Sequence, residues 1–254
     1  MKFRNAIVRR PCPEMINGIT SSNLGKPDYY KAILQHDKYI EALIKCGLEV
    51  TLLESDSHFP DSCFIEDVAI CTEKFAVVTN PGAISRNGEK DGMKGVLSSF
   101  FQSIYEIESP GTLDGGDVMR TGDHFYIGIS DRTNHSGANQ LIQILSKTGF
   151  TASKIVCGDI LHLKTGLSYI ENNVLLTHKR FLHLSEFVEF QKIIIPEEEE
   201  YAANSLWING NVIVPAGFPL TKSHIENVGY KVIEVDVSEF RKLDGGLSCL
   251  SLRF

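Results

Sequence analysis

The chain has 254 residues, of which 43% are hydrophobic and 22% are charged, and its formal net charge is −7. This length can bury a sizeable core, and the composition is that of an ordinary globular protein. The negative charge argues against nucleic-acid and anionic-membrane partners, and no apolar run approaches the length of a membrane span.

Six cysteines occur, and none of them forms a Cys-x-x-Cys pair. The N-terminus lacks the apolar segment of a secretory signal, so we expect a cytoplasmic protein without a disulfide framework. The spacing of a zinc cage is absent as well, and we predict neither a metal nor a cofactor. The sequence leaves homo-oligomerisation open.

The predicted elements repeat a unit of strand, loop, helix and strand five times. In chain order the strand, helix and strand of each unit are expected at 6–8, 27–46 and 49–53; 75–78, 89–105 and 106–107; 125–128, 134–147 and 154–156; 174–176, 186–192 and 193–195; and 212–214, 222–228 and 231–235. Apolar residues at helical spacing from Tyr30 to Ile44 and Pro27 in a first helical turn favour the first helix. Gly47, Gly149 and Gly229 stand where helices end.

No linker divides the chain, so we predict a single α/β domain over residues 1–254. Two architectures accommodate five such units: an open doubly wound sheet, and a ring of five units around a pseudo-fivefold axis. The repeat pattern by itself slightly favours the open sheet, which is commoner. The candidate functional residues favour the ring, because they follow the repeats at about one group per unit and only a ring gathers them at a centre.

These candidates are a thiol, an imidazole and several carboxylates next to turn signals. Cys249 follows an Asp-Gly-Gly turn, and His162 follows an apolar run. Acidic residues cluster at Asp61, Glu66 and Asp67, and again at Asp114 and Asp117. Individually each has an ordinary structural explanation, such as a buried thiol, a core histidine or a turn former. Together they indicate a thiol nucleophile acting on a cationic substrate.

The motifs in this order resemble the dimethylarginine dimethylaminohydrolases, guanidine-modifying enzymes of the pentein superfamily. The resemblance covers essentially the whole chain and is carried by Gly18-Ile19-Thr20-Ser21-Ser22, Phe59-Pro60-Asp61-Ser62 with Phe64-Ile65-Glu66-Asp67, Gly111 to Asp117, His162 to Gly166, and Asp244-Gly245-Gly246 through Cys249 to Phe254. It implies a five-bladed α/β propeller with the site at its centre. It also implies hydrolysis of methylated arginine to citrulline and methylamine or dimethylamine.

Residue roles follow from the resemblance. Cys249 is the expected nucleophile, His162 the acid and base, and Asp114 the third catalytic residue. The small-molecule substrate is expected to meet Asp67, Glu66, Asp61, Phe64, Arg86, Arg132 and the backbone of Ile19 and Leu243. The loop 17–26 is a candidate lid.

Two other functions compete with this one. Arginine and agmatine deiminases usually carry an acidic residue two positions after the catalytic histidine, where this chain has Lys164. A non-catalytic partner-binding pentein is the alternative from another class, and the intact thiol, imidazole and carboxylates argue against it.

Overall fold

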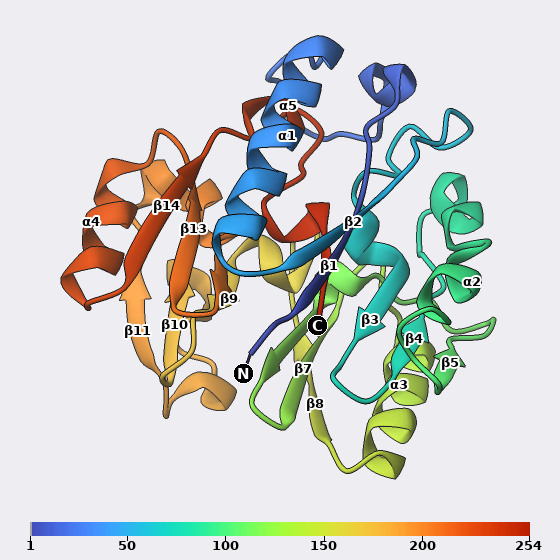
Figure 1. Cartoon of the computed structure of the whole chain (residues 1–254). Coiled ribbons are helices and arrows are strands. Elements are labelled where there is room, and N and C mark those ends of the chain that lie inside the picture. Colours follow the sequence, from blue (N-terminus) through green and yellow to red (C-terminus); the bar gives the residue numbers. More distant parts are fainter. Residues whose placement is uncertain (1) are drawn as a thin grey trace.

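The computed structural model describes residues 2–254, which form five three-stranded sheets with helices packed between and outside them (Figure 1). The strands are β1 (Asn5–Arg9), β2 (Glu49–Leu53), β3 (Ala69–Cys71), β4 (Ala76–Val78), β5 (Ile104–Glu106), β6 (Val118–Thr121), β7 (His124–Ile129), β8 (Thr151–Val156), β9 (Leu167–Tyr169), β10 (Val174–Thr177), β11 (Gln191–Ile194), β12 (Leu206–Ile208), β13 (Asn211–Pro215), β14 (Lys231–Val235) and β15 (Leu252–Arg253).

Every sheet has the same plan. A central strand pairs in parallel with the strand that follows it, as β1 does with β2, and antiparallel with a short third strand, as β1 does with β15. The other sheets have the orders β3-β4-β5, β6-β7-β8, β9-β10-β11 and β12-β13-β14. The parallel pairs are the ten strands predicted from the repeats. The open doubly wound sheet is wrong, because the strands of different units do not join into one sheet.

The helices are α1 (Tyr29–Lys45), α2 (Met93–Leu97), α3 (His135–Lys147), α4 (Pro219–Asn227) and α5 (Ser238–Arg241). The side chain of Asp28 accepts the backbone N–H of Lys31 and caps α1, so Pro27 precedes the helix rather than lying in its first turn. Helix α3 lies within the range expected at 134–147, and α4 begins three residues before the range expected at 222–228.

Two predicted helices are wrong. The stretch 89–105 contains only the short α2, because Gly92 adopts a left-handed conformation (φ 79°) that ends the preceding turn. The stretch 186–192 is a short 3-10 turn, Ser185–Phe187, followed by β11, which begins at Gln191. In the second of these stretches, β11 begins inside the range expected for the helix.

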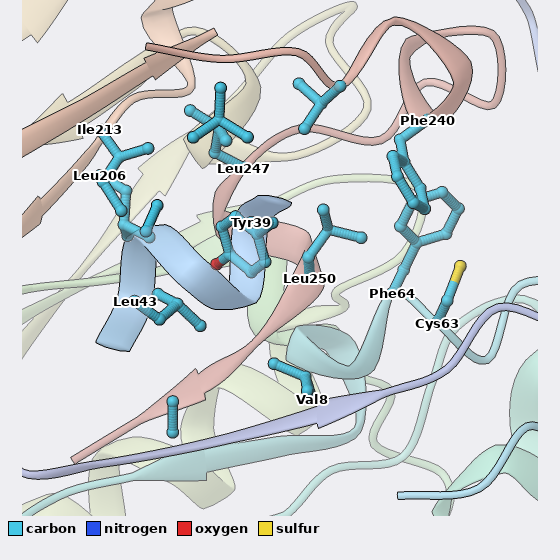
Figure 2. Packing of buried hydrophobic residues seen from close by; sticks show 14 of the residues in the cluster. Val8, Tyr39, Leu43, Cys63, Phe64, Leu206, Ile213, Phe240, Leu247 and Leu250 are labelled. Atoms are coloured by element: carbon cyan, nitrogen blue, oxygen red, sulfur yellow. The ribbon is translucent and has the colours of Figure 1, made fainter. Parts of the chain in front are cut away.

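The largest buried cluster joins the first and last parts of the chain through α1. Tyr39 and Leu43 on this helix belong to the same buried cluster as Leu206, Ile213 and Leu250 (Figure 2). Each such fully buried side chain stabilises the fold by about 1.5–3 kcal/mol. The hydroxyl of Tyr39 meets the Ser251 hydroxyl at 2.6 Å, so the helix also contacts the segment that carries Cys249.

A 3-10 turn lies before each third strand, with at most two residues between them. These junction turns are Ile65–Val68, Gly115–Asp117, Leu163–Thr165, Glu197–Ala203 and Ser248–Leu250. Hydrogen bonds link consecutive turns: Gly116 N–H to Asp67, Leu163 N–H to Asp117, and the Asn204 side chain to the Lys164 carbonyl. Ser248 N–H to Asn204 and the Ser248 hydroxyl to Glu66 complete a closed circuit.

The junction turns thus bring distant segments together, and most predicted site residues lie on them or beside them. None of the helices within residues 2–254 combines the length and apolar composition of a bilayer-spanning segment.

Candidate active site

One cavity of about 150 Å³ gathers nine of the eleven residues predicted for the site. Its lining includes Ile19, Asp61, Phe64, Asp67, Arg86, Arg132, His162, Leu243 and Cys249. A smaller adjoining cavity shares His162 and Cys249 with it and is lined by Glu66 as well. Asp114 is fully buried directly behind His162. The structure therefore places all eleven residues around one centre.

His162 is held by one ring nitrogen. Its Nε2 lies 3.0 Å from Oδ2 of Asp114, and the other oxygen of Asp114 accepts the Gly82 N–H at 2.8 Å. The Nδ1 atom of His162 makes no hydrogen bond within residues 2–254, so it is the nitrogen left for proton transfer. This is the geometry of an oriented acid or base.

Charge around His162 favours its protonated form. Burial lowers the pKa of the imidazole, but Asp67, the hydrogen bond to Asp114 and the nearby Asp117 outweigh burial and raise the pKa to about 9. His162 is consequently an imidazolium at neutral pH and can donate a proton to a leaving group.

The glycines of the Asp-Gly-Gly-Asp motif permit this close packing. A Cβ atom on Gly116 would lie 2.6 Å from Nδ1 of His162, and one on Gly115 would lie 1.9 Å from the carbonyl oxygen of Glu66. Any larger residue would push the two junction turns apart. Asp117, the last residue of the motif, accepts hydrogen bonds from the Ser130 hydroxyl and the Leu163 N–H, so its carboxylate links neighbouring segments.

Cys249 stands on the last junction turn, partly accessible from the cavity, and its Sγ accepts the Gly246 N–H at 3.4 Å. Burial and the negative charges of Glu66 and Asp67 raise the pKa of the Cys249 thiol to about 12. The thiol is therefore protonated in the empty cavity. A bound cation next to these carboxylates would lower its pKa.

Asp67 provides the fixed negative charge of the cavity. Burial raises the pKa of its carboxyl, but His162 and Arg86 outweigh burial and hold the pKa below its ordinary value. Its oxygens accept hydrogen bonds from Nη1 of Arg86 at 2.6 Å and from the Gly116 N–H at 2.9 Å. An ionised carboxylate in this position suits a guanidinium.

The two predicted carboxylate-binding arginines differ. Arg86 is buried and bonds to Glu89 through Nε and Nη2, to Asp67 through Nη1 and to the Phe64 carbonyl through Nη2. The side chain of Arg132 has no such partner within residues 2–254 and lines the cavity. Arg132 is thus the better placed of the two to receive a substrate carboxylate, with its fork of donors free.

The loop 17–26 closes one side of the cavity. The Ile19 N–H donates to both oxygens of Asp61 at 3.1 and 3.2 Å. Ser21 donates its N–H to Asp244 at 2.6 Å, and the Thr20 hydroxyl donates to the Lys242 carbonyl at 2.8 Å. Four hydrogen bonds from Thr20, Ser21 and Ser22 to the segment before Cys249 therefore hold the loop, while its movement as a lid stays a prediction.

Glu66 lines the smaller adjoining cavity together with Cys249 and is already paired. Its Oε1 accepts Lys164 at 2.6 Å and Arg253 at 2.9 Å, and its Oε2 accepts the Ser248 hydroxyl at 2.7 Å. These bonds occupy both oxygens. The substrate contact expected for Glu66 therefore stays a prediction, and its observed contacts brace the segment that carries the thiol.

Asp67, Asp114 and His162 also offer three ligand-type atoms within 4.8 Å of one another. Each is engaged, however: Asp67 by Arg86, and Asp114 by His162 and Gly82. A metal ion would have to displace the Arg86 pair and the imidazole proton. The residues present fit an organic cation better.

The comparisons with known proteins agree with this geometry. A family model described as N,N dimethylarginine dimethylhydrolase, eukaryotic, matches residues 24–173. The N(G),N(G)-dimethylarginine dimethylaminohydrolase of Pseudomonas aeruginosa is 52% identical, over 99% of this chain and 100% of that protein. The chain belongs to the dimethylarginine dimethylaminohydrolase family. The Streptomyces coelicolor enzyme of the same name is 32% identical, over 100% of this chain and 98% of that protein.

Solved structures extend the likeness to three dimensions. The C249S mutant of the Pseudomonas aeruginosa enzyme complexed with citrulline matches with a TM-score of 0.99 at 50% identity and full coverage of both chains. A dimethylarginine dimethylaminohydrolase H162G adduct with S-methyl-L-thiocitrulline matches with a TM-score of 0.97 at 51% identity, over 99% of this chain and 100% of that one. The fold is the α/β pentein fold.

Sequence reasoning missed the structural roles of four residues that hold the candidate site together. Lys164 and Arg253 hold Glu66, and Asn204 and Ser248 close the circuit of junction turns. One signal was available: Asn204 precedes the third strand of its sheet, as the functional residues do in the other four. The third strands have two to four residues, too few to show a pattern, so this equivalence was hidden.

Proposed function

We propose that the chain hydrolyses N(ω)-methylated arginine to citrulline and dimethylamine or methylamine through a covalent Cys249 intermediate. One shared cavity supports this reaction most directly. It combines a thiol, a protonated imidazole anchored by Asp114, an ionised Asp67 and an unpaired Arg132. A small methylated guanidinium with an α-carboxylate at its far end has the complementary charges.

In the first half of the reaction, the substrate cation offsets the negative charge that keeps Cys249 protonated, and the thiol releases its proton to solvent. The thiolate forms a bond to the guanidinium carbon, giving a neutral tetrahedral adduct. His162 donates its Nδ1 proton to the methylated nitrogen, and the C–N bond breaks. The amine leaves, and an S-alkylthiouronium cation remains on Cys249.

In the second half, the now neutral His162 takes a proton from water while the water oxygen bonds to the same carbon. The C–S bond breaks, and the proton of the new hydroxyl group passes to the sulfur, which regenerates the Cys249 thiol. The carbon becomes the carbonyl carbon of citrulline. His162 is left protonated, and the released amine takes up a proton from solvent, so the overall change is addition of one water to the substrate cation.

The remaining roles place the two ends of the substrate. Asp67 accepts guanidinium N–H groups, with Glu66 behind it, and Phe64 packs against the aliphatic stem. Arg132, with Arg86 beside it, binds the α-carboxylate. Asp61 and the carbonyl groups of Ile19 and Leu243 hold the α-ammonium. Each role combines the observed position in the cavity wall with the chemistry of the group.

We further propose that residues 1–254 form a single domain and that its five sheets are the blades of a propeller. The closed circuit of hydrogen bonds through the junction turns supports this arrangement. Loop 17–26 is proposed as the lid of the cavity. Assembly into a homo-oligomer and a cytoplasmic location stay predictions.

Purified protein assayed for citrulline from dimethylarginine, monomethylarginine and arginine tests this function. We expect turnover of the methylated substrates to exceed that of arginine. Trapping by acid during turnover should show a mass increase on the peptide that contains Cys249. Faster turnover of arginine would instead identify a deiminase, and citrulline from none of the three would favour a non-catalytic binding protein.

A further inference from the structure

A third cavity, of about 160 Å³, is lined by Glu66 as well. It shares a wall with the small cavity beside Cys249, and that wall consists of Glu66, Lys164, Asn204 and Ser248. The residues that line the proposed substrate cavity are all different from those that line this third cavity. We call this third cavity the rear cavity.

The rear cavity is rich in positive charge although the whole chain carries −7. Lys164 and Arg253, which both line the rear cavity, bond to the same oxygen of Glu66, so this group of three side chains carries one excess positive charge. Lys164 donates one hydrogen bond within residues 2–254, so two of its three N–H groups have no acceptor there. Arg120 lines the same space and pairs with the exposed Glu73.

Most of the remaining lining is apolar or aromatic, including Ile70, Val118, Phe125, Leu206 and Trp207. Such walls favour an apolar body, and the excess positive charge of Lys164, Arg253 and Glu66 favours one negative charge. Ligand pockets for drug-sized molecules span about 300–1,000 Å³, so a cavity of this volume suits a smaller compound.

We propose that the rear cavity binds a small organic monocarboxylate with an apolar or aromatic body. Its carboxylate meets Lys164 on the shared wall, and its body packs against Val118, Phe125 and Trp207. One added negative charge neutralises the group formed by Lys164, Arg253 and Glu66, so a monoanion fits better than a dianion or a neutral compound.

This site communicates with Cys249 through Arg253. Nη1 of Arg253 donates to the carbonyl of Ser248, the residue before Cys249, at 2.9 Å, and Nη2 donates to Glu66. A carboxylate that draws Lys164 or Arg253 away from Glu66 changes the bonds that brace this segment. We therefore expect occupancy to lower kcat without raising KM.

Trp207 allows a direct test, because it is the only tryptophan of the chain. Full-length protein is titrated with benzoate, with benzamide as the neutral control, while tryptophan fluorescence is recorded. Benzoate should give a saturable change that benzamide does not give, and saturating citrulline should leave the benzoate affinity unchanged. The W207F variant, followed by calorimetry, should still bind benzoate.

Charge variants sharpen the result. Arg120→Gln should weaken benzoate binding about threefold, as expected for loss of one partly screened charge. The matched control Arg180→Gln removes the same charge from an exposed turn outside the cavity and should leave binding unchanged. Lys164→Met should abolish the saturable signal, and circular dichroism verifies that this variant is folded.

A linear, non-saturating response, equal effects of benzoate and benzamide, or displacement of benzoate by citrulline would overturn the proposal, and the rear cavity would then hold only water. The fluorescence readout does not depend on turnover. Failure of the proposed reaction and failure of this site are therefore separate outcomes.

Discussion

Glu66 and Asp67 are neighbours in the chain but meet opposite surroundings. Glu66 faces two cations, Lys164 and Arg253, on the wall toward the rear cavity. Asp67 faces the substrate cavity together with His162, and Arg86 is its cationic partner. The 3-10 turn sends the two side chains to different sides of the same wall.

This difference shows how one short turn separates two electrostatic environments. On the front side, Asp67 and Asp114 keep His162 protonated. Burial and the negative charges of both Glu66 and Asp67 oppose a thiolate at Cys249. On the rear side the cations fix Glu66, which accepts the Ser248 hydroxyl and so positions the thiol segment. The front wall, which lines the substrate cavity, favours a cation. The rear wall, toward the rear cavity, holds the segment that carries Cys249.

The largest expected effect tests whether the front wall performs the chemistry. Cys249→Ser should lower turnover of dimethylarginine by more than about 1,000-fold, because a hydroxyl is a much poorer nucleophile than a thiolate. Cys71→Ser, a matched change at a cysteine outside the substrate cavity, should keep turnover within about twofold. Initial-rate citrulline assays measure both, and a fully active C249S variant would remove the thiol from the mechanism.

The next effect tests the anchor of the imidazole. Asp114→Asn keeps the shape but removes the charge that helps to hold the pKa of His162 near 9. We expect kcat to fall about 100-fold to 10,000-fold, the usual contribution of an oriented acid or base. In the unaltered protein kcat should decline above pH 9, where His162 loses its proton, and this alkaline limb should move to lower pH in the variant. An unmoved limb would show that another group donates the proton.

The two arginines allow a finer comparison within the front wall. Arg132→Met should raise KM for dimethylarginine about 10-fold to 100-fold, as expected for loss of charged hydrogen bonds to a carboxylate, with a smaller change in kcat. Arg86→Met should instead lower the melting temperature, because it leaves Asp67 and Glu89 buried without their cation. Equal KM effects without loss of stability in R86M would place both arginines on the substrate.

The smallest expected effect concerns a buried group outside both walls. His36 is fully buried without a hydrogen-bond partner within residues 2–254, and burial lowers its pKa from 6.5 to about 4. The unfolded chain therefore binds this proton more readily, and the contribution of His36 to stability is lost as pH falls from about 6.5 to 4. Urea unfolding of His36→Leu across this range should show a weaker acid dependence than the unaltered protein. An identical dependence would show that His36 is hydrated.

Much of the architecture was predictable because the parallel strand pairs are apolar runs bounded by glycine turns. The second and fourth helices were not, since Gly92 and the early start of β11 override a weak local pattern. Within the candidate site, motifs pointed to Cys249, His162 and the acidic residues. The partners of Glu66 were missed, because Lys164 and Arg253 lie 98 and 187 positions away along the chain.

The sequence by itself determined the five repeats, the family and the chemical types gathered for the reaction, because strand periodicity and turn motifs are local. Only the tertiary structure decided which carboxylate faces the cavity, which arginine has free donors and which nitrogen of His162 is anchored. These properties depend on burial and on partners from distant segments, and both arise only when the five junction turns meet.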